Sequence, residues 1–594
     1  MGGETGAAME YSAWNPGVST GIPREFAALE TIFRPECVFT GIAEIDELAA
    51  LTGLPHEELT VFRPQRLALH EIIIRVTADI AVAEGEEEED FGRNFRRIAT
   101  RIRDAYVVPH MGEIEQAYAE LSQRAAALVS WILAETLFPP PPPAAARGWF
   151  GRWRRDKRPS APSEPAAERE YRIVAGYKTL GLGTEDPLWR AAYKSLYRVL
   201  GAIAGKRGRL GADRELLAKL VARHVCNSQG SQLIGQMIAP CVVAAIDAEG
   251  YVRVATQAAP VLISLKGASA AGKSSLRPML KQVLREQGIA ADGYATISPD
   301  VWRRQLLDYE SLGPARKYAG HLTSRELMVI DGKLDRYIRD KADREHAIPH
   351  LLVDRFRFDS FTAEKVARVL HDTYARYVHT MYMYFIVTPP ETTVLRGWQR
   401  ALERGRYKAV EDYLAHGVEA YRGMPKILFK WLASPRPEYR YVFLDNRVAR
   451  GSFPKTIASG DRDRMVIYDP AAFIDIERYQ KVDIHAGAPA DLYPAASDLT
   501  VAANSGFLRE CVRRMATLEF VDRDSGHSYL RARRGSFEVQ DAALLARVLE
   551  DAELAAALGA IAPGLAAPGQ ELALAGPRSE IPGRQSPTRR NTLS

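Results

Sequence analysis

The hydrophobic pattern of this 594-residue chain changes character along its length. Apolar residues recur every three or four positions through residues 26–138 and again through residues 171–241, which is the spacing of amphipathic helices. A denser apolar run, residues 242–254, predicts a strand, a turn and a second strand. The pattern therefore predicts a helical N-terminal domain over residues 1–138 and a second, mainly helical module over residues 171–255.

Short, continuous apolar runs follow. They lie at residues 260–266, 293–300, 350–354, 380–390 and 439–446, and helix-like segments separate them. Strands that alternate with helices are typical of a parallel sheet covered by helices on both faces. Residues 256–450 are therefore predicted to form one α/β domain.

The C-terminal part has a mixed pattern. Strands are predicted at residues 465–469 and 473–476, a hairpin at 519–522 and 527–531, and a helix at 541–558. Residues 451–562 are thus expected to form a small α+β region. The Pro-, Ser- and Arg-rich residues 563–594 are expected to be a disordered tail.

A linker is predicted at residues 139–170. Five consecutive prolines, residues 139–143, favour an extended conformation, and a basic, aromatic patch follows at residues 147–158. Two interpretations of the patch remain open, namely contact with an anionic membrane or nucleic acid, and a flexible basic linker.

Composition narrows the class of protein. A hydrophobic content of 46% and a charged content of 26% are ordinary for a soluble globular chain, and a net charge of +5 gives no general reason to expect nucleic-acid binding. The four cysteines form no CxxC pair, which favours a reduced, cytoplasmic protein. We expect no signal peptide, and we expect no transmembrane segment because no apolar run reaches about 18 residues.

A glycine-rich loop follows the first apolar run of the α/β domain, and a predicted helix follows the loop. Its residues are Gly267, Ala268, Ser269, Ala270, Ala271, Gly272, Lys273, Ser274 and Ser275. A strand, a loop ending in Gly-Lys-Ser and a helix is the context of a phosphate-binding P-loop. The loop's N–H groups and the helix N-terminus would bind nucleotide phosphates, Lys273 would reach the β- and γ-phosphates, and Ser274 would hold Mg²⁺. ATP and Mg²⁺ are the expected cofactors.

Acidic residues end the second and third strands. Asp300 is expected beyond the carboxyl end of its strand, where a base can accept the proton of a substrate hydroxyl, although an Asp there also suits a helix N-cap. Asp354 is a candidate for orienting Mg²⁺-bound water or binding the acceptor. Arg355 and Arg357 suit either an acceptor phosphate or a structural ion-pair cluster.

Three arginines follow the fourth strand at intervals of four residues, namely Arg396, Arg400 and Arg404. This spacing places them on one helix face, where their mutual repulsion favours either an anionic ligand or full solvation. A lid that closes on a triphosphate is the functional interpretation. Asn446, at the end of the fifth strand, is a candidate contact for the nucleotide base.

An acidic run lies far from this domain in the sequence, at residues 84–90. An acidic metal or partner site and a solvated loop both fit its composition.

This order of motifs over about residues 255–450 resembles the zeta-toxin family of P-loop kinases, and it is also similar to chloramphenicol phosphotransferases and polynucleotide kinases. The resemblance implies that Lys273 and Ser274 bind ATP and Mg²⁺, that Asp300 is catalytic, and that Arg303 and Glu326 contact the substrate. Asp354 stands where the family usually has Glu, and the lid arginines would be Arg396 and either Arg404 or Arg406. Pro278, inside the helix after the loop, is a departure from an ordinary P-loop helix.

The resemblance implies phosphorylation of a hydroxyl on a nucleotide sugar such as UDP-N-acetylglucosamine. We therefore expect an ATP-dependent small-molecule kinase. The alternatives are a nucleotide-binding regulatory protein that does not transfer phosphate, and a polynucleotide 5′-hydroxyl kinase. The helical N-terminal region is a candidate surface for a protein partner, or a segment that masks the active site of its own chain.

Overall fold

The computed structural model describes residues 11–139, 164–355, 374–449, 452–563 and 572–573. The proline run beyond Pro139, the basic patch, Arg357 and nearly all of the predicted tail lie outside these residues.

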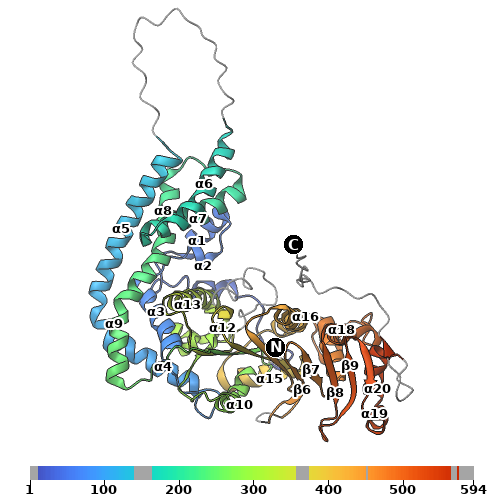
Figure 1. The fold of residues 1–594 in the computed structure, drawn as a ribbon. Helices are drawn as coiled ribbons and strands as arrows, with labels where there is room; N and C mark the ends of the chain where they lie inside the picture. Colours follow the sequence, from blue (N-terminus) through green and yellow to red (C-terminus); the bar gives the residue numbers. More distant parts are fainter. Residues whose placement is uncertain (1–10, 140–163, 356–373, 450–451, 564–571, 574–594) are drawn as a thin grey trace, which may run out of the picture.

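A single sheet runs through the α/β region and the C-terminal region (Figure 1). Strand β1 (Val261–Gly267) lies between β3 (His350–Val353) and β4 (Thr380–Val387). Beyond them lie β2 (Tyr294–Ile297) next to β3, and β5 (Glu438–Asp445) next to β4. These five strands pair in parallel, so the strands predicted from the apolar runs are confirmed.

The C-terminal strands extend the same sheet beyond β5. They are β6 (Lys455–Gly460), β7 (Arg464–Ile467), β8 (Thr517–Val521), β9 (Ser528–Arg533), β10 (Ser536–Val539) and β11 (Leu572–Ala573). Because β6 pairs antiparallel with β5, the boundary predicted at residue 450 falls between two neighbouring strands. The predicted hairpin is confirmed as the antiparallel pair β8 and β9.

One predicted C-terminal strand is wrong. Residues 473–476 lie in helix α17 (Ala471–Arg478), where Phe473, Ile474 and Ile476 are fully buried. A short apolar run does not distinguish a buried helix from a strand, because periodicity is lost when every side is covered. Helices α18 (Gly506–Arg514), α19 (Ala542–Val548) and α20 (Ala552–Ile561) complete this region.

Helices cover both faces of the parallel strands. Alternate residues of β1 point to opposite faces, so Ile263 and Leu265 join a core with Leu276 and Leu280 of α10 (Lys273–Glu286), while Leu262 belongs to the larger core. That larger core includes residues of α13 (Ser324–Glu345) and α16 (Val410–Ala433). The remaining helices of this region are α11 (Arg303–Leu306), α12 (Ala319–Leu322) and α15 (Pro390–Arg404).

The N-terminal region is helical, as predicted, and rises from one end of the sheet (Figure 1). Its α-helices are α1 (Ile42–Thr52), α2 (His56–Leu59), α3 (Pro64–Asp79), α4 (Asp90–Ile102), α5 (Met111–Thr136), α6 (Ala166–Gly183), α7 (Pro187–Arg207), α8 (Arg214–Val225) and α9 (Ser231–Glu249). Helix α3 is buried along almost its whole length, between α9 on one side and α13 and β2 on the other. The helical region and the sheet therefore share one hydrophobic core.

The strand, turn and strand predicted over residues 242–254 are wrong. Helix α9 continues to Glu249, and Gly250, at a φ of +68°, ends it where the turn was expected. Its packing against α3 outweighs the strand preference of the adjacent valines.

Within the described part of the chain, one continuous helical stretch, Arg214–Glu249, is long and apolar enough to cross a membrane. Length and composition are the only grounds for this, which makes the stretch weak evidence for a membrane span. All four cysteines are free.

A buried ion cluster joins α3 to α13. Arg66 donates from Nε and Nη2 to the two carboxylate oxygens of Glu326 (2.5 and 2.6 Å), and His70 Nε2 lies 2.6 Å from the same carboxylate. Burial is the largest influence on Glu326 and opposes ionisation, but Arg66 and His70 outweigh it and hold its pKa well below the ordinary value. Burial lowers the pKa of His70 to about 3, so this imidazole is neutral.

Replacing Glu326 with alanine should destabilise the fold by about 3–5 kcal/mol, because Arg66 would remain buried without its carboxylate. Glu310→Ala is a matched control, since Glu310 pairs with Arg316 at the surface (2.8 Å) and should contribute less than about 1 kcal/mol. Urea unfolding of both variants measures the difference, and equal midpoints would contradict the structural importance of the cluster.

Candidate functional site

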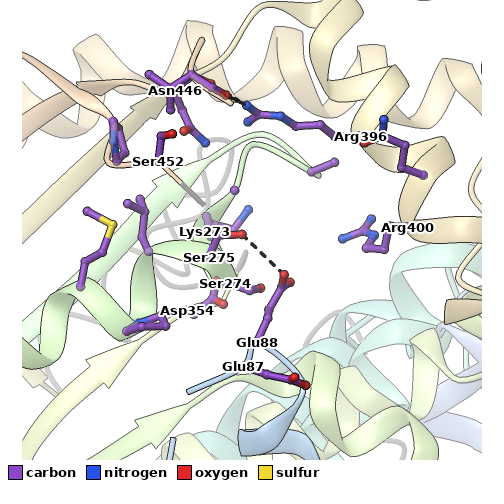
Figure 2. A pocket seen from close by; sticks show the side chains of 18 of the residues that line it. Glu87, Glu88, Lys273, Ser274, Ser275, Asp354, Arg396, Arg400, Asn446 and Ser452 are labelled. Carbon is purple, nitrogen blue, oxygen red and sulfur yellow. Dashed lines mark hydrogen bonds between the residues drawn. The ribbon is translucent and has the colours of Figure 1, made fainter. Parts of the chain in front are cut away.

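A cavity of about 1100 Å³ opens where the parallel strands end (Figure 2). It brings together segments that are distant in the sequence: the glycine-rich loop, the residues after β2, β3 and β5, the arginine face of α15, and the acidic residues 86–89. Carboxyl ends of parallel strands meet at one edge of a sheet, which is where doubly wound folds bind ligands.

The glycine-rich loop turns sharply between β1 and α10. Ala270 and Gly272 adopt φ values of +60° and +96°. The carbonyl of Ala271 accepts hydrogen bonds from Thr388 Oγ1 (3.1 Å) and Asn446 Nδ2 (2.6 Å), which fasten the loop to the ends of β4 and β5. Asn446 therefore holds the loop, a role that the sequence did not predict.

Lys273 begins α10 and lines the cavity with Ser274. Its Nζ donates to the carbonyls of Gly267 (3.1 Å) and Ala268 (2.9 Å). Burial lowers the pKa of Lys273, while Asp354 and Asp300 act in the opposite direction. The ammonium group is thus held at the positive end of a helix, beside a loop whose backbone curls around the cavity. Pro278 lies inside α10, which continues without a break to Glu286.

Asp300 lies in the turn after β2 and opens into the cavity, with 50% of its side chain exposed. Arg303 Nε donates to Oδ1 (3.1 Å), and Arg406 Nη2 lies 2.7 Å from Oδ2. Burial raises the pKa of this carboxyl, but the positive charges of Arg406 and Arg303 outweigh burial and hold the pKa well below its ordinary value. Asp300 is therefore ionised, and it does not cap a helix through its side chain.

Asp354 follows β3 and faces the same cavity. Burial raises its pKa, against the opposing effect of Lys273. Ser274 and Asp354 offer a hydroxyl and a carboxylate, which are the oxygen ligands that Mg²⁺ prefers. The described residues contain no group of three His, Cys, Asp or Glu able to hold a metal ion.

The arginines of α15 share a face, as predicted, and line the cavity. Arg396 Nη2 donates to the carbonyls of Asn446 (2.9 Å) and Val448 (2.7 Å), so it holds the segment after β5. Arg400 Nη2 donates to Tyr413 (3.4 Å), while its buried Nε has no hydrogen-bond partner among the residues that the structure describes. Arg404 pairs with Glu88 and Glu89, which come from the N-terminal region. Gly405 ends the helix at a φ of +65°.

A side pocket of about 90 Å³ extends the cavity past Asp300. Arginines from four segments line it, namely Arg96, Arg277, Arg303, Arg304, Arg400, Arg404 and Arg406. Arg304 Nη2 donates to the carbonyl of Arg404 (2.9 Å). Burial and then the neighbouring Arg304 lower the pKa of Arg96, which makes no ion pair among the described residues.

Two residues expected to bind substrate lie elsewhere. Glu326 is fully buried in the cluster with Arg66 and His70, so its position is structural. Arg355 is 6% exposed and donates to Asp331 (2.7 Å) and Asp335 (2.5 Å), which is the ion-pair alternative left open by the sequence. Glu326 finds its partners on α3, and Arg355 finds two of its partners on α13, so both charges are satisfied within the chain.

Sequence reasoning missed Arg96, Arg304 and residues 86–89 as part of the cavity. The acidic run was visible, but nothing in a single sequence indicates that it lies beside a loop almost 190 residues further along the chain.

Comparisons with known proteins give partial likenesses. No family model matches the chain, and no curated protein matches it. A structure of AvrRxo1-ORF1 with ORF2 and ATP is 15% identical, with a TM-score of 0.29, and the match covers 47% of this chain and 75% of that one. The structure described for the PezAT chromosomal toxin–antitoxin system of Streptococcus pneumoniae is 15% identical, with a TM-score of 0.24, and covers 44% and 88%. At these values the functional argument rests on the geometry of the site.

Gly272→Ala should weaken ATP binding at least about tenfold, because a Cβ at this positive φ would collide with Asn446 Nδ2 and displace the loop. Gly288→Ala is the control: its φ is +75°, but nothing lies within 4 Å of the added carbon. Calorimetric titration with Mg²⁺-ATP, after thermal melting confirms folding, separates loop geometry from simple backbone strain. Equal affinities in the two variants would contradict the assignment of the phosphate loop.

Proposed function

We propose that the protein is an ATP-dependent kinase that transfers the γ-phosphate to a hydroxyl of a small molecule. The observation that carries the proposal is that Lys273 and Ser274, Asp300, and the arginines at 400–406 line one continuous cavity. Phosphate binding alone needs only the loop. Phosphoryl transfer needs, in addition, a carboxylate that accepts the proton of the acceptor and positive groups that stabilise the phosphoryl oxygens. Asp300 and the arginines beside it are groups of these kinds.

The reaction follows from these positions. The acceptor oxygen bonds to the γ-phosphorus as the bond from that phosphorus to the β–γ bridging oxygen breaks, so ADP leaves. The hydroxyl proton passes to Asp300. This carboxylate has enough lone pairs to accept the hydroxyl while it keeps one arginine. Lys273, Arg400 and Arg404 would stabilise the charge that develops on the phosphoryl oxygens. Mg²⁺, held through Ser274 with Asp354 nearby, would neutralise the β- and γ-phosphates.

The side pocket bears on the class of acceptor. Asp300 compensates Arg303 and Arg406, whereas Arg96 and Arg304 make no ion pair among the described residues. An acceptor with its own phosphate or carboxylate would satisfy these two guanidinium groups. A nucleotide sugar such as UDP-N-acetylglucosamine has this chemistry, and it is also what the resemblance to zeta toxins implies.

Asp300→Ala should lower phosphate transfer by at least about 100-fold and leave ATP affinity almost unchanged, since the carboxylate acts on the acceptor. The assay follows label from γ-labelled ATP into a metabolite extract. Asp308→Ala is the control, because Asp308 is exposed and its carboxylate accepts a local hydrogen bond from the N–H of Glu310 (3.0 Å). Full transfer by Asp300→Ala would contradict its role. ATP binding by the parent without transfer to any acceptor or water would favour the regulatory alternative.

Arg96→Gln should raise the KM for UDP-N-acetylglucosamine about tenfold with little change in kcat, because the lost contact is to the acceptor's charge and not to the reacting atoms. Arg97→Gln, which alters an exposed arginine of the same helix, should leave both constants unchanged. Steady-state kinetics at saturating ATP make the comparison. An unaltered KM in Arg96→Gln would exclude the side pocket as the acceptor site.

A further inference from the structure

The acidic segment Glu84–Asp90 lies against the phosphate end of the nucleotide cavity. It leads from the region of α3 into α4, and Glu86, Glu87, Glu88 and Glu89 line the cavity. Figure 2 shows Glu88 directed toward the start of α10, where the Ser275 hydroxyl lies 3.5 Å from its carboxylate. A run of four glutamates thus occupies the neighbourhood in which a triphosphate would place its own negative charge.

Several contacts fasten this segment to the kinase core. Glu84 is 8% exposed and accepts a hydrogen bond from Thr296 Oγ1 (2.9 Å) at the end of β2. Lys281 donates to the carbonyl of Gly85, and Arg277 Nη2 donates to the carbonyl of Glu88 (3.2 Å). The segment is therefore a specific part of the cavity wall, with two of its contacts made by α10, the helix that follows the phosphate loop.

The carboxylates of the segment hold an arginine of the candidate lid. Arg404 Nη1 lies 3.1 Å from Glu88 and 2.9 Å from Glu89, and Arg404 Nη2 donates to Glu88 (3.1 Å). Burial raises the pKa of Glu88, but Arg404 outweighs burial and the net pKa is low, so this glutamate is ionised. An arginine whose guanidinium group is bound to two carboxylates is not available to phosphate oxygens.

The segment is folded into a turn of its own. Asp90 Oδ2 accepts hydrogen bonds from the N–H groups of Glu86 (3.0 Å) and Glu87 (2.9 Å), which folds the segment into a compact turn before α4. Gly85, at a φ of +68°, begins this turn, and a Cβ there would collide with Asp90. The glutamates are consequently held together in one turn, which Glu84 anchors to β2.

We propose that residues 84–90 are an intramolecular inhibitor of the kinase site, in which Glu88 and Glu89 compete with the phosphates of ATP for Arg404. This inference rests on the proposed function, because it requires that the cavity bind a nucleoside triphosphate. In the resting chain the glutamates take the place of phosphate at Arg404 and repel further negative charge. ATP binding requires that they withdraw, so the N-terminal region sets the affinity of the site for ATP.

The test compares two variants that remove the same charge from the same segment. Glu88→Gln/Glu89→Gln removes both carboxylate partners of Arg404. Glu86→Gln/Glu87→Gln neutralises two other cavity-lining glutamates, which form no ion pair with Arg404 in the described part of the chain. Affinities for AMP-PNP, ADP and adenosine are measured by calorimetry on the full chain with Mg²⁺. The first variant should bind AMP-PNP about tenfold more tightly, ADP with a smaller gain and adenosine no differently. The second should gain clearly less affinity for AMP-PNP than the first, because it removes the same charge from the cavity wall but leaves both partners of Arg404 in place.

A second measurement follows the segment itself. Saturating AMP-PNP should increase amide hydrogen exchange at residues 85–89 in the parent chain, because the turn must leave its contacts with α10 and Arg404. Adenosine should leave this exchange unchanged.

The possible results separate this inference from the proposed function. If all three proteins bind AMP-PNP with the same affinity, or if both variants gain equally, the inhibitory role of Glu88 and Glu89 is wrong while nucleotide binding stands. If neither the parent nor either variant binds AMP-PNP, the proposed function fails and the inference falls with it. Thermal melting of the variants confirms that any loss of binding is not a loss of folding.

Discussion

The parallel pairing of β1 with β3 and β4 is the constraint on which the site depends. Because these strands run in one direction, the loop after β1, Asp354 after β3 and the hydrogen-bonding groups after β4 and β5 all emerge at one edge. Thr388 and Asn446 then fix the carbonyl of Ala271 from the ends of β4 and β5. The turn at Ala270 and Gly272 is thus fixed to the ends of two neighbouring strands, which leaves Lys273 at the start of α10 facing the cavity.

Local pattern was sufficient for the five parallel strands, because each is a short apolar run followed by polar or turn residues. It was also sufficient to predict that the glycine-rich loop and Asp300 follow the ends of their strands, and that Arg396, Arg400 and Arg404 share one helix face. Each of these positions follows from spacing along a single element. The pattern failed where a short apolar run belongs to a helix. Residues 473–476 and 242–249 have the composition of strands, yet both are helices whose apolar residues pack against other helices.

Contacts between charged residues that are far apart in the sequence could not be predicted, for a different reason. Glu326 and Arg355 carry charges suited to a substrate, and only the placement of α3 and α13 shows that buried ions of the same chain satisfy them. Arg96 and Glu88 are the reverse case, since they belong to a helical region with no chemical motif of its own. Sequence spacing gives the positions of side chains along one element. The role of a charged side chain depends on which group of another segment contacts it, and spacing does not give that.

The helical region and the parallel-sheet region therefore form one physical unit. Helix α3 fills a core shared with the sheet, and its Arg66 neutralises a carboxylate on α13 that would otherwise be buried alone. The same region supplies Arg96 to the side pocket and Glu88 to the phosphate end of the cavity. Cutting the chain before β1 would uncover apolar surface. It would also leave the carboxylate of Glu326 without Arg66 and His70. A change that loosened the N-terminal region without unfolding it would act first on the pair between Arg404 and Glu88. These two side chains line the cavity and are partly exposed, whereas Arg66 and Glu326 lie in the core, so the former pair separates at smaller cost.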